Sequence, residues 1–245
     1  MTITTYEEWL SQVDTDTENV SKDKEELYRF VKEGYETFDG VKKADLTWRM
    51  GRAAFKVAAA AELSNNKDRA RKFLDEAEEW MRKSVSLDDK CSEAHFWLAT
   101  VGGKICDHLG TKERINKAKE IQHHLEEAIK INPNEYITYY TYGRWCFEVA
   151  GLSWMERKIA SVVFGAPPEA TFQDALDKFI KVNELKPQWK ANLIWMAKCA
   201  VKVKDYKTAI KYADEAAAAE STDEEDILFE PDLKEILAKY ASYRS

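Results

Sequence analysis

Histidine and cysteine, the residues whose side chains most often do chemistry, are few in this chain and widely spaced. His123 and His124 are adjacent, so on a helix their side chains point about 100° apart and cannot share one metal ion. Cys91 and His95 have the i, i+4 spacing of a ligand pair, but no second pair accompanies them. The sequence also lacks a glycine-rich phosphate loop, an HExxH motif and a GxSxG motif. These patterns predict no catalytic site, no metal site and no cofactor.

The cysteines and the N-terminus indicate the cellular compartment of the protein. The four cysteines form no CxxC pair, and each lies in a predicted helix beside apolar neighbours: Cys91, Cys106, Cys146 and Cys199. We expect buried, reduced thiols, as in an intracellular protein. No run of 18 or more apolar residues is present, and the N-terminus MTITTYEEWL is too acidic for a signal or transit peptide. The sequence therefore predicts a cytoplasmic chain without a transmembrane segment.

Charge is distributed unevenly along the chain. Residues 1–39 and 213–245 each carry a net charge of -7, and residues 40–212 carry +7. A basic middle suits an anionic partner, such as an acidic protein segment or anionic phospholipid headgroups. Lysines also occupy the outward faces of helices without any partner, and the sequence leaves that alternative open. Acidic ends and the lack of a recognised motif argue against nucleic-acid binding.

One recurring junction shows which elements carry these side chains. Ile121, Leu125 and Ala128 form one face of a predicted helix. This helix ends before Pro133, because proline has no backbone N–H to donate a hydrogen bond. A new periodic run begins three residues later and places the small Gly143 where two packed helices would approach closely. This helix–turn–helix pattern is typical of the tetratricopeptide (TPR) repeat.

The junction recurs around Asp89 and Pro187, and it predicts helices that begin at Ser92, Tyr136 and Lys190. Four divergent helix pairs follow, over 45–89 (split at 64–66), 92–133 (split at 110–111), 136–187 and 190–220. We expect an all-α, right-handed TPR-like superhelix with residues 23–245 as a single domain. Helices over 23–38 and 231–243 would cap it, and 152–171 would be a helical insertion. Residues 1–22 would hold a short helix, capped reciprocally by Thr5 and Glu8, and then an acidic loop.

The repeat phase also predicts a concave groove, lined by the first helix of each pair. The residues placed there are mostly basic or aromatic: Arg49, Lys56, Phe96, Lys104, Tyr140, Arg144, Phe147, Lys198 and Lys202. Arginine binds a carboxylate through two parallel hydrogen bonds and aromatic rings supply contact area, so the groove suits an extended acidic segment. The chain's own acidic residues 220–230 could fill the groove instead and act as an autoinhibitory tail.

The insertion contains a short amphipathic helix that ends before Pro167. Its apolar stripe consists of Met155, Ile159, Val162, Val163 and Ala166. We expect this helix to dock on the array, with Trp154 packed around Phe172 and Leu176. The alternative is that it lies in a membrane interface with its basic residues toward the headgroups.

Two segments, YGRWCFEVAGLS and WMERKIASVVFGAPPEATFQDAL, resemble the regulator of microtubule dynamics family. That family is marked by Gly-x-Trp-Cys, Trp-x-x-Arg-x-Ile-Ala and Phe-x-x-Pro-Pro inside a TPR-like domain, and the likeness covers roughly residues 25–240. The matching residues are Gly143, Trp145, Cys146, Trp154, Arg157, Ile159, Ala160, Phe164, Pro167 and Pro168.

The resemblance implies a non-enzymatic cytoplasmic adaptor associated with microtubules and the mitotic spindle. The predicted groove would then receive acidic tubulin tails or another acidic protein segment. Some family members bind phospholipid and act at membrane contacts. The alternative function is therefore a phospholipid-binding or lipid-transfer module.

Overall fold

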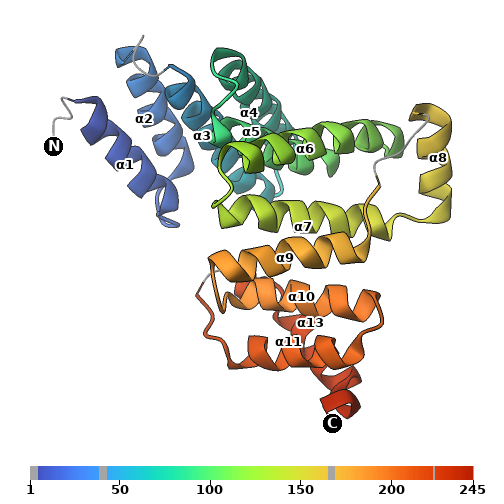
Figure 1. The fold of residues 1–245 in the computed structure, drawn as a ribbon. Helices are drawn as coiled ribbons and strands as arrows, with labels where there is room; N and C mark the ends of the chain where they lie inside the picture. Colours follow the sequence, from blue (N-terminus) through green and yellow to red (C-terminus); the bar gives the residue numbers. More distant parts are fainter. Residues whose placement is uncertain (1–4, 39–42, 165–168, 223, 245) are drawn as a thin grey trace. The chain divides into compact units, whose positions relative to one another are not determined.

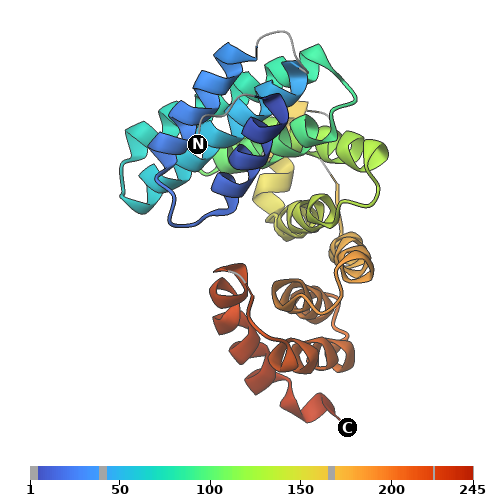
Figure 2. The same ribbon diagram turned by 90° about the vertical axis from the view of Figure 1, so that its left-hand side faces the viewer.

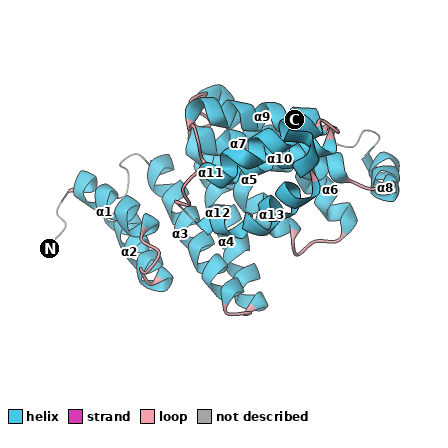
Figure 3. Ribbon diagram, turned by 90° about the horizontal axis from the view of Figure 1, so that it is seen from below, coloured by secondary structure: helices cyan, strands magenta, loops and turns pink. Residues whose placement is uncertain are grey.

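The computed structural model describes residues 5–38, 43–164, 169–222 and 224–244. Within these ranges every regular element is a helix, as Figure 3 shows, which confirms the predicted all-α class. The chain divides into two compact units, Met1–Ile131 and Asn132–Ser245. A single domain over residues 23–245 stays a prediction.

The first unit is a stack of helices joined by short turns (Figure 1). Helix α2 packs on α3, α4 packs on both α3 and α5, and α5 packs on α6. The bounds are α1 (Tyr6–Glu18), α2 (Lys24–Thr37), α3 (Lys43–Leu63), α4 (Lys67–Leu87), α5 (Ser92–Cys106) and α6 (Thr111–Ile131).

The turn between α3 and α4 lies where the sequence predicts it. Asn65 adopts a φ of 56°, in the left-handed region that asparagine tolerates better than most residues. Asn66 caps α4, because its side chain accepts a hydrogen bond from the backbone N–H of Arg69 (3.2 Å). The predicted split at 110–111 is also confirmed, since α6 begins at Thr111.

The N-terminal helix is longer than the sequence suggests. The capping box between Thr5 and Glu8 is confirmed. The prediction of an acidic loop from Asp14 onward is wrong, because α1 continues to Glu18 and buries Val13 and Thr17. The acidic residues of this stretch are not all solvated, since Asp14 forms ion pairs with two arginines of α3.

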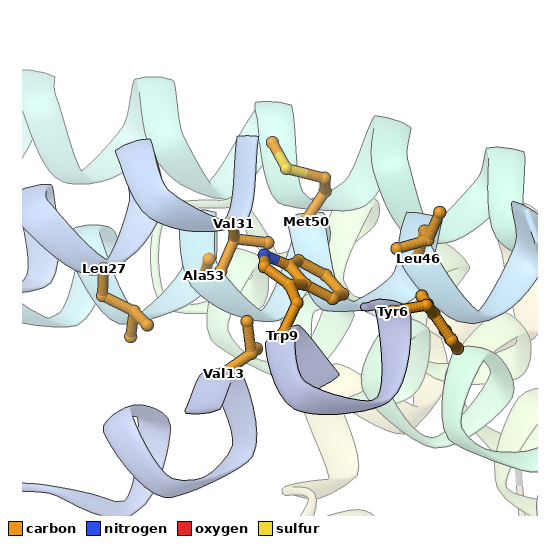
Figure 4. Close-up of a cluster of buried hydrophobic side chains, with 8 residues drawn as sticks. All are labelled: Tyr6, Trp9, Val13, Leu27, Val31, Leu46, Met50 and Ala53. Carbon is orange, nitrogen blue, oxygen red and sulfur yellow. The ribbon is translucent and has the colours of Figure 1, made fainter. Parts of the chain in front are cut away.

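Trp9 is the central side chain of the core beneath α1 (Figure 4). It is 2% exposed and lies among Val31 of α2 and Met50 and Ala53 of α3. A Cβ atom at Gly34 would overlap the indole ring of Trp9, so only glycine allows α1 to approach α2 this closely. Helices α1 and α2 thus cover the first TPR-like pair, as terminal elements of a repeat array must.

The second unit stacks four long helices in the order α7, α9, α10 and α11, and Figure 1 shows them as successive rows. The C-terminal helices pack beside α10 and α11, as Figure 2 shows in red. The bounds are α7 (Tyr136–Gly151), α8 (Trp154–Phe164), α9 (Phe172–Leu185), α10 (Lys190–Lys202), α11 (Tyr206–Ala218), α12 (Glu224–Leu228), α13 (Glu230–Lys239) and the 3₁₀ helix η1 (Ala241–Arg244). The helix starts predicted at Ser92, Tyr136 and Lys190 are confirmed.

Gly143 lies where α7 and α9 approach most closely. A Cβ atom built on it would lie 2.8 Å from the Phe179 ring, which is fully buried. This confirms the predicted role of Gly143 as a packing residue at the helix junction.

The prediction that the insertion helix docks through its apolar stripe is wrong. Trp154, Met155 and Val162 of α8 are 72%, 66% and 79% exposed. The ring of Phe172, the expected partner of Trp154, packs on Phe147 instead, with centroids 5.1 Å apart. Ala166 and the side chain of Val163 lie outside the described residues.

Helix α8 is held by its polar face. The Arg157 Nη2 atom donates to the carbonyl oxygens of Val149 (3.1 Å) and Ala150 (2.8 Å), and its Nε atom donates to that of Leu152 (3.2 Å). These carbonyls belong to the end of α7, where backbone acceptors have no partner within the helix. Arg157 therefore caps α7 and fixes α8 to it.

Candidate protein-interaction site

In the first unit, the predicted groove residue Arg49 is enclosed rather than open. It is 7% exposed, and its guanidinium lies 3.0 Å from an Asp14 carboxylate oxygen and 2.5 Å from one of Asp45. Arg52 lies 2.5 Å from Asp14 as well. Burial opposes ionisation of Asp14, but the two arginines outweigh it and hold the pKa of Asp14 below its usual value. The charge of Arg49 is therefore balanced by α1 and by its own helix.

The other three predicted residues of this unit are half-buried. The Lys104 Nζ atom lies 2.9 Å from Glu62 and 3.0 Å from Asp107, so its charge too is balanced inside the unit. The Phe96 ring packs edge-on against Trp97, with centroids 5.3 Å apart. Lys56 lies on α3. The ion pairs and ring contacts of Arg49, Phe96 and Lys104 thus lead to separate neighbours rather than to one cluster.

In the second unit, the structure brings the predicted groove residues together. Tyr140, Arg144 and Phe147 lie on α7, and Lys198 and Lys202 lie on α10. The Phe147 ring packs on Trp195, with centroids 5.2 Å apart. The two lysine Nζ atoms lie 5.8 Å and 5.9 Å from the centre of the Phe147 ring.

Trp195 is the centre of this cluster, and sequence reasoning missed it. The Lys198 Nζ atom lies 3.8 Å above its ring, within the range of a cation–π interaction, and the Arg144 Cζ atom lies 5.8 Å away. By the predicted repeat phase, Trp195 falls one residue after a position that would line the groove. Its signal in the sequence was an aromatic residue three positions before a lysine, on a helix that carries three lysines.

The chain's own acidic C-terminal segment lies on this cluster. The Arg144 Nη1 atom is 3.0 Å from Glu225 Oε1, the Lys190 Nζ atom is 3.1 Å from Glu230 Oε2, and the Lys198 Nζ atom is 2.5 Å from Asp232 Oδ2. The Phe229 ring packs on Trp195 edge-on, with centroids 5.1 Å apart. Of the two occupants that the sequence left open, an outside partner or residues 220–230, the structure shows the second. We call residues 225–232 the acidic segment.

Asp226 makes the most buried contact of the acidic segment. Its Oδ1 atom accepts a hydrogen bond from the backbone N–H of Ala191 (2.7 Å), and its side chain is fully buried. Trp189, the N-cap residue of α10, supplies no side-chain hydrogen bond to the free amides of that helix. A carboxylate that lies 35 residues further along the chain therefore caps α10, where the helix dipole also favours a negative charge.

Three polar atoms of the site are buried: Tyr140 Oη, Trp195 Nε1 and Glu225 Oε2. Tyr140 is 2% exposed and Trp195 is 5% exposed. Burial and then the charge of Glu225 raise the pKa of Tyr140, so its hydroxyl stays protonated and able to donate. Hydrogen bonds with Glu225 and Trp195 also affect this pKa, so the two donors and the carboxylate lie close to one another.

The remaining motif residues are structural where they are described. Trp145 is buried and packs on Tyr142, with ring centroids 5.6 Å apart. Pro167, Pro168 and the side chain of Phe164 lie outside the described residues. Burial raises the pKa of the Cys91 thiol to about 11, so this cysteine is not an activated nucleophile. In the described part of the chain no group of three or more potential ligands could hold a metal ion.

Comparison with known proteins places the chain in a family. The family model of regulator of microtubule dynamics protein 1-3 matches residues 9–241. The chain belongs to this family. The match includes the Gly-x-Trp-Cys segment, helix α8 and the acidic segment.

Curated relatives in this family include regulator of microtubule dynamics protein 1 of Bos taurus, which is 31% identical over 96% of this chain and 72% of its own length. Protein 3 of Rattus norvegicus is 30% identical over 79% of this chain and 41% of its own length. Protein 2 of Bos taurus is 32% identical over 78% of this chain and 46% of its own length. The chain thus spans less than half of these protein 2 and protein 3 relatives.

Solved structures establish the repeat fold. A thermophilic TPR protein of Thermus thermophilus superimposes with a TM-score of 0.55 at 10% identity, over 90% of each chain. A crystal structure of MamA covers 97% of this chain and 94% of its own, with a TM-score of 0.54 at 14% identity. The TPR-like fold is therefore confirmed. Among the described residues, no helix is both long and apolar enough to cross a bilayer.

Proposed function

We propose that this protein is a non-enzymatic, microtubule-associated adaptor that binds an acidic protein segment through α7 and α10. Its family and the names of its curated relatives support the microtubule assignment. The single observation that carries the site is the set of three ion pairs that Arg144, Lys190 and Lys198 make with acidic residues. Localisation in the cytoplasm, on the cytoskeleton and the spindle, follows from this proposal.

The chemistry of the site favours a protein segment rich in carboxylates, such as an acidic tubulin tail. Cationic groups stand over or beside aromatic rings, so they can pair with carboxylates while the rings supply apolar contact. Lys202 is exposed at the end of α10 and adds a further positive charge for a longer partner.

Charge reversal tests the proposal. The triple substitution Arg144→Glu, Lys198→Glu and Lys202→Glu should weaken co-sedimentation with microtubules by about tenfold or more, because each exposed pair contributes a few tenths to one kcal/mol and reversal adds repulsion. Added salt should weaken binding of the unchanged chain, since exposed charges are screened.

The matched control reverses three lysines whose ion pairs, among the described residues, lie within their own helices: Lys130, Lys181 and Lys211. It changes net charge equally and should leave binding nearly unchanged. Equal losses in both triple variants would show that binding follows overall charge and that α7 and α10 form no specific site.

A second candidate function is association with phospholipid surfaces through α8. The observation that favours it is the exposed apolar face of that helix, Trp154, Met155 and Val162, with the Lys158 Nζ atom 5.0 Å from the Trp154 ring centre. An aromatic residue beside a basic one is typical of helices that lie in a membrane interface.

A further inference from the structure

The acidic segment matches the site of α7 and α10 group by group. We propose that residues 225–232 are an internal ligand, which holds this site and shows the pattern of the partner: carboxylates on both sides of an aromatic anchor. The proposal rests on the proposed function, because it concerns the same site and the same class of partner.

The first position of the pattern is the carboxylate of Glu225. Arg144 binds one of its oxygens at 3.0 Å, and the other oxygen is buried without a hydrogen bond. The Tyr140 hydroxyl and the Trp195 N–H are also buried, and both can donate a hydrogen bond. The charge and a hydrogen bond of Glu225 help to raise the pKa of Tyr140, so the carboxylate bound by Arg144 also faces the Tyr140 hydroxyl.

The aromatic anchor is Phe229, four residues after Glu225. Its ring packs edge-on against Trp195, and the Arg144 Cζ and Lys198 Nζ atoms lie 5.8 Å and 5.2 Å from its centre. An aromatic ring between two cations and a tryptophan gains both apolar contact and cation–π attraction. A partner with an aliphatic residue here would lose the second contribution.

The remaining carboxylates fix the spacing. Asp226 caps α10, Glu230 pairs with Lys190, and Asp232 pairs with Lys198. With Glu225 as the first position, the pattern has acidic residues at positions 1, 2, 6 and 8 and an aromatic residue at position 5. The site thus selects an acidic segment by the order of its groups, and net charge alone does not satisfy it.

The ion pairs of the acidic segment are weak enough to be displaced, and its buried contact is the cap that Asp226 forms on α10. The side chains of Arg144, Glu225, Glu230 and Asp232 all keep contact with solvent, so their ion pairs contribute little net energy and are screened by salt. Ile227 and Leu228 point outward and are 69% and 65% exposed. The apolar anchors, Leu233 and Ile236, are buried on α13 and would keep the rest of that helix in place after its first turn, which carries Glu230 and Asp232, has left with the acidic segment. As a tethered competitor, the acidic segment acts at an effective concentration on the order of millimolar.

The test uses a fluorescent peptide of residues 224–234 and the full chain, with affinity measured by anisotropy. The opened variant carries Glu225→Gln, Phe229→Ala and Asp232→Asn, which remove three contacts of the acidic segment and leave α7 and α10 unchanged. It should bind the peptide at least tenfold more tightly than the unchanged chain does. Adding Arg144→Glu to the opened variant should abolish binding, and a peptide with Phe229→Ala should bind poorly.

The matched control carries Glu220→Gln, Ile227→Ala and Glu235→Gln, which are changes of the same kind at exposed positions. It should behave like the unchanged chain. The single variant Glu225→Gln, whose fold can be checked by circular dichroism, should also bind the peptide more tightly if the triple variant loses helix content. An opened, folded variant that binds no tighter than the unchanged chain would overturn the proposal.

Microtubule co-sedimentation separates this proposal from the proposed function. Tighter microtubule binding by the opened variant supports both. If the opened variant binds the peptide but not microtubules, the internal ligand is supported and the microtubule partner is contradicted. In a third outcome, microtubule binding depends on Arg144, but the opened variant binds microtubules and the peptide no more tightly than the unchanged chain does. That result would support the proposed function and contradict the internal ligand.

Discussion

Gly143 shows how one missing side chain sets the distance between two helices. Replacing it with leucine places a Cβ atom 2.8 Å from the Phe179 ring, which is fully buried. We expect Gly143→Leu to destabilise the protein by roughly 1–3 kcal/mol or more, measured by urea denaturation. Gly103→Leu is the control, because a Cβ atom at Gly103 meets nothing within 4 Å. It should be neutral or stabilising, since glycine lowers helix stability. Equal stability of the Gly143→Leu variant and the unchanged chain would contradict the assigned repeat phase.

A buried histidine pair makes the first unit sensitive to acid. The Nδ1 atoms of His95 and His124 lie 2.9 Å apart, and both side chains are buried. Burial, followed by the charges of His95 and His123, lowers the pKa of His124 from 6.5 to about 4. The unfolded chain therefore binds a proton near pH 6.5, whereas the folded chain binds it only near pH 4.

Stability from this group is complete above pH 6.5 and is lost as the pH falls toward 4. Between about pH 7.5 and about pH 5.0 the free energy of unfolding should fall by roughly 2 kcal/mol, and urea denaturation at the two values measures it. His124→Gln should remove most of this dependence. His108→Gln should keep it, because His108 lies at the surface beside Glu62. An unchanged pH dependence in the His124→Gln variant would show that other groups cause it.

At the residue scale, the sequence predicted which basic and aromatic residues would line the groove, but it did not predict the groups with which they pair. Arg49 and Arg144 were both predicted to line the groove, yet Asp14 from α1 encloses the first, and the acidic segment pairs with the second. Asp226 looked like one acid among many, and its capping of α10 depends on a contact over 35 residues. Periodicity identifies the face of a helix, whereas such partners are fixed only by the tertiary fold.

At the element scale, the helix starts were predictable because the turns carry local signals. Pro133 and Pro187 end helices, and Asn65 and Asn66 form a turn through backbone preferences that the sequence alone reveals. Helix α8 was misjudged for a different reason. Arg157 attaches the helix to the carbonyls at the end of α7, and Met155 and Val162 of the apolar stripe remain exposed. An apolar stripe predicts that a face avoids water but does not identify what covers it.

The exposed face of α8 gives a test of the proposed association with phospholipid surfaces. Val162→Asp places a charge at a position that is 79% exposed, so the melting temperature should change by less than the scatter of surface substitutions. Flotation with anionic vesicles should fall several-fold, because a charge in the membrane interface opposes insertion. Ser161→Asp, an exposed neighbour outside the apolar stripe, is the control. A large loss of stability in Val162→Asp would contradict the exposure of this face, and unchanged flotation would contradict the lipid function.

At the scale of the whole molecule, the charge asymmetry has a structural use within each unit. The acidic N-terminal region supplies Asp14 to Arg49 and Arg52, and the acidic C-terminal region supplies three carboxylates to basic residues of α7 and α10. Each end of the chain thus neutralises basic groups of its own unit. The basic middle of the sequence predicted an anionic partner, and acidic groups of the same chain pair with part of it.

Whether residues 23–245 behave as one domain is the remaining prediction at this scale. Repeat arrays couple each pair to its neighbours, so a continuous array unfolds cooperatively even when it contains two compact units. We expect one calorimetric transition whose calorimetric and van't Hoff enthalpies agree. Gly143→Leu should lower its midpoint by a few degrees without splitting it, because about 1 kcal/mol shifts a chain of this size by about 2–4 °C. Hydrogen exchange should then accelerate in α4 and α5 as well as in α7 and α9. Two resolved transitions, with only one shifted by Gly143→Leu, would establish two independent domains that meet near Asn132.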